Sequence, residues 1–185
     1  MPAEKRKIII IPGFGESESE EAYIQLKEDI QSYSGSIVEF YNPIWDRRTV
    51  RHWINDFKNK FKDGDLSKFT VIGFSMGAYI TLALSNEQKF KKIILASLSP
   101  YFKENLKQLP EDALKFMSKN RIKDFSSVMV PSTINSSCTF LFGDKDWKIA
   151  IAQAEKLASK YNGKFFLIKD TGHELTENYI KKITA

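Results

Sequence analysis

The chain has 185 residues, 42% of them apolar, and its 28 basic against 23 acidic side chains give a formal net charge of +5. This composition excludes an intrinsically disordered protein, and a chain of this length can bury a core without disulfides or metals. The charges are interspersed rather than gathered into a basic arm, which argues against a nucleic-acid-binding protein.

The single cysteine, Cys138, has no partner for an internal disulfide, and no Cys/His cluster has the spacing of a zinc site. The N-terminal apolar run is too short for a signal peptide, and no run approaches the ~18 apolar residues of a membrane span. We therefore expect a cytoplasmic protein without stable membrane insertion. Cys138 falls within a predicted strand and is expected to be a core residue.

Six short apolar runs predict strands in chain order at 7–12, 36–43, 69–75, 92–100, 138–144 and 164–170. Most are continuous rather than alternating, which is typical of strands covered on both faces. Helical patterns lie between or after them at 20–33, 49–61, 76–84, 149–161 and 174–183. This order predicts a single α/β domain over 1–185, with a six-stranded, mainly parallel sheet and helices on both faces.

The alternation breaks once, after the fourth strand, where residues 101–133 predict a short helical insertion around Pro110. Its apolar side chains face either a bound acyl group or only the body of the protein, and the sequence leaves both readings open. They are Leu106, Leu109, Leu114, Phe116, Met117, Ile122 and Phe125.

A second group of side chains follows the second predicted strand: Trp45, Arg47, Arg48 and Arg51. A solvated basic face is the favoured reading of this group. Contact with an anionic or aromatic substrate is the alternative.

The segment Gly73-Phe74-Ser75-Met76-Gly77 matches the pattern G-x-S-x-G at a predicted strand-to-helix junction. In that pattern the serine occupies a strained conformation at a sharp turn, and the glycines avoid collisions where helix and strand crowd together. Ser75 is therefore the candidate nucleophile. The alternative is a glycine-rich turn that only lets a helix pack closely.

A serine nucleophile needs a general base, and the chain has two histidines. His52 lies within a predicted helix and is read as a surface or half-buried helical residue. His173 follows the last predicted strand in the loop KDTGHEL. We take His173 as the candidate base, with an ordinary turn histidine as the alternative.

An acid must orient that base, and three aspartates are candidates. Asp144 and Asp146 follow the fifth predicted strand in FLFGDKDW, whereas Asp170 precedes the histidine loop. Asp146 starts the next helix, where the loop can carry it toward the base. Asp144 is read as a turn or capping residue, so Asp146 is favoured.

The chain order Ser75, Asp146, His173, each at the end of a predicted parallel strand, resembles that of the α/β-hydrolase superfamily. The likeness covers essentially the whole chain. It implies an α/β-hydrolase fold with the first predicted strand between the second and third, and a lid at 101–133. The chain begins directly at the strand leading to PGFG, so we expect the superfamily's first two antiparallel strands to be missing.

The loop Ile11-Pro12-Gly13-Phe14-Gly15 resembles the superfamily's HG-x-G oxyanion loop, with Pro12 in place of the frequent histidine. By this resemblance, the backbone N–H groups of Phe14 and of Met76, the residue after the nucleophile, hold the developing oxyanion. Pro-Gly is also a common turn signal, so the loop by itself is weak evidence.

These residues predict a serine hydrolase that cleaves a carboxylic ester or thioester of a small acyl substrate through an acyl-enzyme. Cleavage of an amide is the second choice of reaction, and acyl transfer to an acceptor other than water would use the same residues. The predicted reaction requires no metal or organic cofactor. A ligand-binding or partner-binding protein on the same scaffold is the alternative from another class, and a scaffold acting through the insertion is a third. The physiological substrate and the oligomeric state are beyond the sequence.

Overall fold

A computed structural model describes residues 5–46, 49–109, 111 and 118–185. Its strands are β1 (Lys7–Ile11), β2 (Ile37–Phe40), β3 (Phe69–Phe74), β4 (Lys92–Ala96), β5 (Ser137–Gly143) and β6 (Lys164–Ile168). Its helices are α1 (Glu21–Ser34), α2 (Val50–Lys60), α3 (Met76–Leu84), α5 (Lys119–Phe125), α6 (Lys148–Lys160) and α7 (Glu177–Thr184), with short 3-10 turns at Leu66–Lys68 and Leu106–Gln108.

The six strands form one sheet in the order β2-β1-β3-β4-β5-β6, and all of its pairings are parallel. The expected six-stranded parallel sheet is confirmed, with β1 between β2 and β3. The direction of winding reverses between β1 and β3. Open parallel sheets bind ligands outside the carboxyl ends of their strands at such a switch point.

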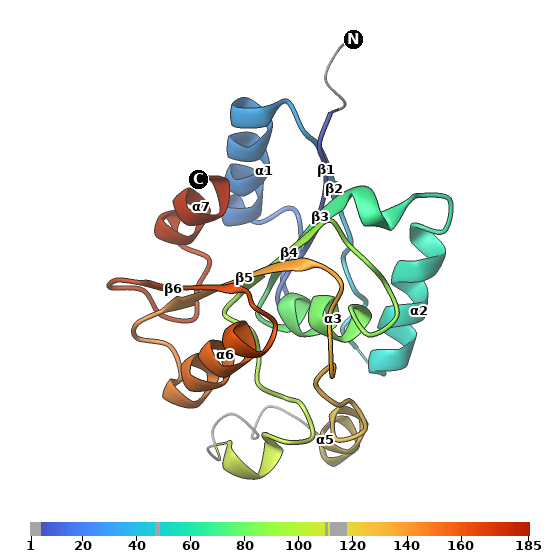
Figure 1. Cartoon of the computed structure of the whole chain (residues 1–185), viewed down its shortest axis with the longest axis vertical. Helices are drawn as coiled ribbons and strands as arrows, with labels where there is room; N and C mark the ends of the chain where they lie inside the picture. Colours follow the sequence, from blue (N-terminus) through green and yellow to red (C-terminus); the bar gives the residue numbers. More distant parts are fainter. Residues whose placement is uncertain (1–4, 47–48, 110, 112–117) are drawn as a thin grey trace.

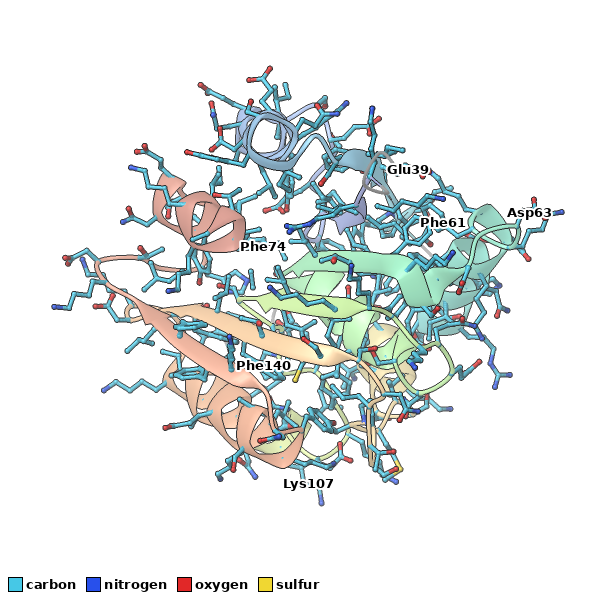
Figure 2. The ribbon with its side chains drawn as sticks, turned by 45° about the horizontal axis from the view of Figure 1, so that its top comes forward. Glu39, Phe61, Asp63, Phe74, Lys107 and Phe140 are labelled. Atoms are coloured by element: carbon cyan, nitrogen blue, oxygen red, sulfur yellow. The ribbon has the colours of Figure 1, made fainter. Side chains whose placement is uncertain are left out.

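Helices cover both faces of the sheet (Figure 1), and each face has its own apolar core. Alternate strand residues point to opposite faces, so neighbouring isoleucines of β1 serve different cores. One core lies beneath α2, α3 and α6 and contains Phe140, and the other lies beneath α1 and α7 and contains Phe74. Figure 2 labels both residues, and it places Asp63 and Lys107 at the periphery.

Helix α3 is buried along its whole length. This burial explains why its sequence is apolar nearly all round, without a polar face. Helix α2 begins differently, at an exposed capping box in which the Thr49 side chain accepts the backbone N–H of His52. His52 is therefore an exposed residue in the first turn of α2, which agrees with its reading as a surface or half-buried helical residue.

Several elements are shorter than predicted; β2, for example, ends at Phe40 rather than at residue 43, and two of the differences have local reasons. Strand β4 ends at Ala96 rather than near residue 100, because Ser97 has a positive φ of 45° and turns the chain away from the sheet. Helix α7 begins at Glu177 rather than 174, after its N-cap Thr176. Both changes lengthen loops at the carboxyl ends of the strands.

The described part of the 101–133 segment lies at the bottom of Figure 1, below α3 and α6, and contributes side chains to the larger core. Leu109 and Phe125 are buried in the larger core, and Leu106 and Ile122 pack against it. The Asp124 carboxylate accepts the N–H of Val50, 2.8 Å away, which ties α5 to the start of α2. Three of the apolar residues predicted to face a ligand or the body, Leu114, Phe116 and Met117, lie outside the described residues.

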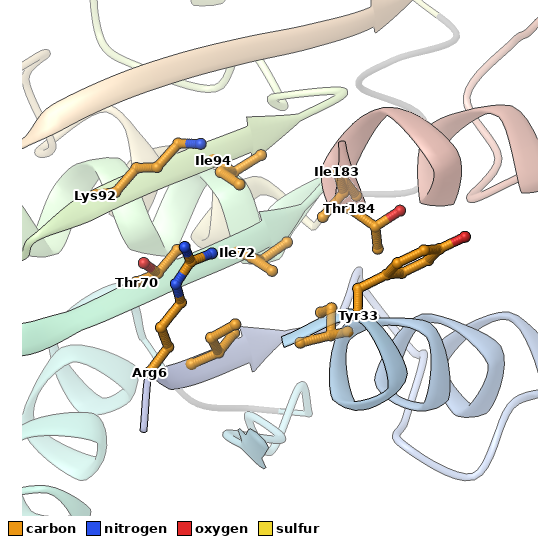
Figure 3. A pocket seen from close by; sticks show the side chains of 10 residues that line it. Arg6, Tyr33, Thr70, Ile72, Lys92, Ile94, Ile183 and Thr184 are labelled. Carbon is orange, nitrogen blue, oxygen red and sulfur yellow. The ribbon is translucent and has the colours of Figure 1, made fainter. Parts of the chain in front are cut away.

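A cavity opens at the amino ends of the strands, between α1 and α7 (Figure 3). Its floor is isoleucine from three neighbouring strands, and Arg6 and Lys92 lie at its edge. It is at the opposite end of the sheet from Ser75. No helix in the described part of the chain is long and apolar enough to span a bilayer.

Candidate active site

Ser75 occupies the turn between β3 and α3 in a conformation that L-amino acids rarely adopt, with φ 52° and ψ −115°. Such a backbone costs about 1–3 kcal/mol and persists only where its surroundings hold it. Here the Ser75 N–H donates to the Ala96 carbonyl at the end of β4, and the Ser75 carbonyl accepts the Tyr79 N–H within α3. The side chain thus stands at the carboxyl end of the sheet.

The two glycines around Ser75 avoid different collisions. A Cβ at Gly73 would lie 2.5 Å from the Gly77 carbonyl oxygen, so this glycine lets β3 turn into α3. A Cβ at Gly77 would lie 2.0 Å from the Ile11 carbonyl oxygen, so this glycine lets the end of β1 approach α3. The second glycine therefore brings the PGFG loop beside the serine, a relationship that the local motif does not reveal.

The ring of His173 lies between Ser75 and Asp146. Its Nε2 is 2.8 Å from Ser75 Oγ, and its Nδ1 is 3.0 and 3.1 Å from the two carboxylate oxygens of Asp146. The indole of Trp147 stacks on the imidazole with ring centroids 5.5 Å apart. These contacts orient the ring, while its side chain keeps 31% of its surface exposed.

The Asp146 side chain is completely buried, and its carboxylate also accepts the N–H of Trp147 at 2.7 Å. Burial on its own would raise the pKa of Asp146, but the hydrogen bond and charge interaction with His173, together with the hydrogen bond from the Trp147 N–H, lower it overall. The carboxylate therefore stays ionised beside the imidazole.

The loops that carry Asp146 and His173 are joined to each other. A Cβ at Gly143 would lie 2.0 Å from the Thr171 carbonyl oxygen, so the close approach requires glycine. The Thr171 N–H donates to Asp144 Oδ1, and the Lys145 N–H donates to the Thr171 carbonyl. Asp144 thus lies in a turn, one of the two roles expected for it, and its side chain ties this turn to the histidine loop. Asp170 forms an exposed ion pair with Lys145, away from the imidazole.

The PGFG loop adjoins the first turn of α3, where Met76 is the first helical residue. The N–H groups of a helix's first turn have no acceptor within the helix, so that of Met76 is suited to bind an anion. On the other side of the loop, the Gly13 N–H donates to Glu16 Oε2 at 2.8 Å, and the Tyr23 hydroxyl also donates to this carboxylate. The loop that carries Phe14 is therefore held from behind.

Glu16 is one of five polar or aromatic residues at the site that sequence reasoning missed. Ser99 Oγ lies 3.2 Å from Ser75 Oγ, and Trp147 covers the imidazole. Ser97 and Tyr179 form a buried pair behind Asp146. Ser97 and Ser99 could have been found from the sequence, because ASLSP follows the strand next to the nucleophile's strand. For Glu16, Trp147 and Tyr179 the sequence held no signal apart from the candidate residues near them in the chain.

The group after β2 is only partly described. Trp45 packs against Phe14, with ring centroids 5.4 Å apart, and the guanidinium of Arg121 from α5 lies 5.4 Å from the Phe14 ring. Arg51 is exposed, and Arg47 and Arg48 lie outside the described residues. In the described ranges, no group of three or more His, Cys, Asp or Glu side chains is arranged to hold a metal ion.

Solved structures similar to this one cover nearly the whole chain. Est1E from Butyrivibrio proteoclasticus superimposes with a TM-score of 0.78 at 14% identity, covering 99% of this chain and 85% of the other. Alpha/beta hydrolase domain-containing protein 10 from mouse superimposes with a TM-score of 0.76 at 15% identity, covering 98% of this chain and 87% of the other. The ydeN gene product of B. subtilis superimposes with a TM-score of 0.66 at 15% identity, covering 98% of this chain and 92% of the other. No protein-family model matches the sequence, and no curated protein matches it either.

Proposed function

We propose that this chain, which has the α/β-hydrolase fold, is a serine hydrolase that cleaves a carboxylic ester or thioester through an acyl-enzyme. One observation carries the proposal: the unbroken row from Ser75 Oγ through the His173 ring to the Asp146 carboxylate, with contacts of 2.8 and 3.0 Å. A nucleophile, a base and an orienting acid within hydrogen-bond reach are what acyl transfer by serine requires.

The reaction follows from the direction of these hydrogen bonds. Asp146 is ionised and accepts the Nδ1–H of His173, which leaves Nε2 as an acceptor for the Ser75 proton. As that proton moves to Nε2, Ser75 Oγ bonds to the acyl carbon, and the carbonyl electrons move onto oxygen. When the tetrahedral intermediate collapses, the bond to the leaving group breaks and the Nε2 proton passes to that group. Water then repeats both steps on the acyl-enzyme and releases the acid.

The backbone N–H groups of Phe14 and Met76 are the proposed oxyanion hole. Support comes from the position of Met76 at the start of α3 and from the close approach of the PGFG loop to that helix. Fixed donors aimed at the developing charge are usually the largest single contribution to such catalysis, and removing one costs about 10²–10³ in kcat.

An ester or thioester is preferred over an amide because its leaving group needs the least protonation. Among the similar structures, Est1E has been solved with ferulic acid bound, which is consistent with a small-molecule acyl substrate here. The insertion at 101–133 is the proposed cover of the acyl group. Acyl transfer to an acceptor other than water would use the same residues. Action in the cytoplasm, without a metal or organic cofactor, is part of the same proposal.

A fluorophosphonate probe followed by peptide mapping tests this function. We expect rapid covalent labelling at Ser75, and p-nitrophenyl acetate hydrolysis that falls by several orders of magnitude in Ser75→Ala. Ser85→Ala is the matched control, because Ser85 is a buried serine at the other end of α3. Wild-type turnover in Ser75→Ala would refute the proposed serine hydrolase. A Ser75 that does not react with the probe, in a protein that binds a ligand with measurable affinity, would favour a binding protein instead.

A further inference from the structure

The cavity at the amino ends of the strands lies at the opposite end of the sheet from Ser75 and has a volume of about 210 Å³. Figure 3 shows Arg6 and Lys92 along one side of it, and Tyr33 and Thr184 along the other. The apolar lining comes from three strands and from α1 and α7, and consists of Ile8, Ile30, Ile72, Ile94 and Ile183. The cavity therefore has an apolar floor with two cations at one side.

The register of the sheet places Lys92 in this cavity. Thr70 of β3 pairs with Ile8 of β1 and with Lys92 of β4, so these three side chains form one row on the face that α1 and α7 cover. Ile94 lies two residues further along β4 and points to the same face. Lys92 is half-buried there, and an ammonium group is costly to bury without a compensating charge.

The described residues supply no compensating charge at this cavity. None of those that line it is acidic, and in the described part of the chain no carboxylate lies within ion-pair distance of Arg6 or Lys92. Burial lowers the pKa of Lys92, and the like charges of Lys164 and Arg6 lower it further. An anion from outside the chain would relieve this repulsion.

A second cavity, of about 310 Å³, shares Arg6 with the first and extends the positive charge. Its described lining consists of Lys5, Arg6, Lys7, Ser67, Lys68 and Lys91, so every lining residue except the serine is a cation. These residues come together because the amino ends of β1, β3 and β4 lie side by side in the sheet. Positive charges that are dispersed in the sequence are thus gathered at one end of the fold.

We propose that the amino end of the sheet binds a small amphiphilic anion, with its phosphate or carboxylate head beside Arg6 and Lys92 and one apolar chain on the isoleucine floor. Guanidinium and ammonium groups form strong, charge-assisted hydrogen bonds with such heads. Pockets for drug-sized ligands hold about 300–1,000 Å³, so the smaller isoleucine-lined cavity suits one short chain rather than a ring system or a two-chain lipid.

Titration calorimetry of the full chain with octyl phosphate tests the site, and butyl phosphate, inorganic phosphate and octanol are the comparison ligands. Octyl phosphate should bind tightest, because only it supplies both the charge and a chain long enough to cover the floor. From butyl to octyl phosphate, the affinity should rise by up to about fourfold for each added methylene. If inorganic phosphate or octanol binds as tightly as octyl phosphate, the proposal is overturned.

Lys92→Met keeps most of the apolar stem but removes the charge, and it should weaken octyl phosphate binding about tenfold or more. Arg6→Gln, at an exposed position, should have the same effect without altering a half-buried residue of the sheet. Lys156→Met is the matched control, since Lys156 is an exposed lysine of α6 on the other face of the sheet. Unchanged affinity in folded Lys92→Met and Arg6→Gln would overturn the proposal.

Ile183→Ala tests the apolar part of the site. It should lower the affinity for octyl phosphate and leave that for inorganic phosphate unchanged, because only the chain reaches this side chain. Ile24→Ala is the control, since Ile24 is an exposed isoleucine of α1 that does not line the cavity. Equal losses in the two variants would contradict a chain seated on the isoleucine floor.

The site is independent of the proposed hydrolase function. Ser75→Ala should bind octyl phosphate as tightly as the wild type, which shows that the signal does not come from the candidate active site. Lys92→Met should in turn keep wild-type turnover of p-nitrophenyl acetate. A protein without hydrolase activity that still binds octyl phosphate through Lys92 would refute the proposed function and leave this second site standing.

Discussion

Oγ of Ser75 lies 2.8 Å from Nε2 of His173, although the two residues are 98 positions apart in the chain. The contact exists because β3 and β6 end at the same edge of one parallel sheet and the loop after β6 returns across the end of β5.

Asp146→Asn should lower kcat by about 10³–10⁴, because an amide cannot hold the Nδ1–H tautomer of His173 in the same way. The measurement is steady-state hydrolysis of a p-nitrophenyl ester. Asp170→Asn is the matched control, since Asp170 is an exposed residue paired with Lys145, and we expect near wild-type turnover from it. Equal losses in the two variants would contradict the assignment of the acid.

Gly77→Ala should destabilise the fold by about 3 kcal/mol, because the new Cβ would meet the backbone carbonyl of Ile11, which cannot move without shifting β1. Urea denaturation followed by tryptophan fluorescence measures the loss. Gly172→Ala is the control, since nothing lies within 4 Å of a Cβ built there. A Gly77→Ala protein as stable as the wild type would show that the PGFG loop does not abut α3 as closely as described.

Arg121→Ala should loosen the attachment of the insertion. Its guanidinium donates to the Trp45 and Asp46 carbonyls and lies 5.2 Å from the Trp53 ring. We expect faster limited proteolysis within 101–133 and a loss of about 1–2 kcal/mol in unfolding free energy. Lys123→Ala, at the last turn of the same helix, is the control. Protease sensitivity that rises equally in both variants would contradict a specific anchor.

Glu16 should make stability depend on pH in an unusual direction. Burial raises the pKa of Glu16 above its ordinary value of 4.5, and this outweighs the lowering by the hydrogen bonds from Tyr23 and Gly13. Between 4.5 and that raised pKa, the folded state binds more protons than the unfolded state, so this group favours folding more as pH falls.

The corresponding measurement compares denaturation of wild type and Glu16→Gln at pH 7.0, 5.5 and 4.5, three working values chosen around the ordinary carboxyl range. The wild type should gain stability relative to the variant on acidification. Glu18→Gln, in the same loop but exposed, should show no such trend. If the wild type instead loses stability relative to Glu16→Gln as the pH falls, the burial of this carboxylate is refuted.

Several features of the protein followed from the sequence alone. Continuous apolar runs alternating with helical patterns predicted the parallel sheet, because only strands covered on both faces can be apolar throughout. Ser75, Asp146 and His173 each followed a predicted strand, and parallel strands bring their carboxyl ends to one edge. Their proximity could therefore be predicted without knowing any distance.

What only the tertiary structure decided was the set of contacts made across the sheet. Gly77 is needed because α3 approaches the end of β1, not because of β3, the strand that precedes the helix. The partner of the Asp144 side chain, the N–H of Thr171 in the loop that carries His173, was likewise not visible in the sequence. Ser97 lies in the ASLSP segment at the end of β4, but nothing in the sequence around Ser97 or Tyr179 indicates that these two residues meet. Their meeting depends on how α7 packs on the sheet, and such packing is set by side chains distant in the chain rather than by the periodicity of either segment.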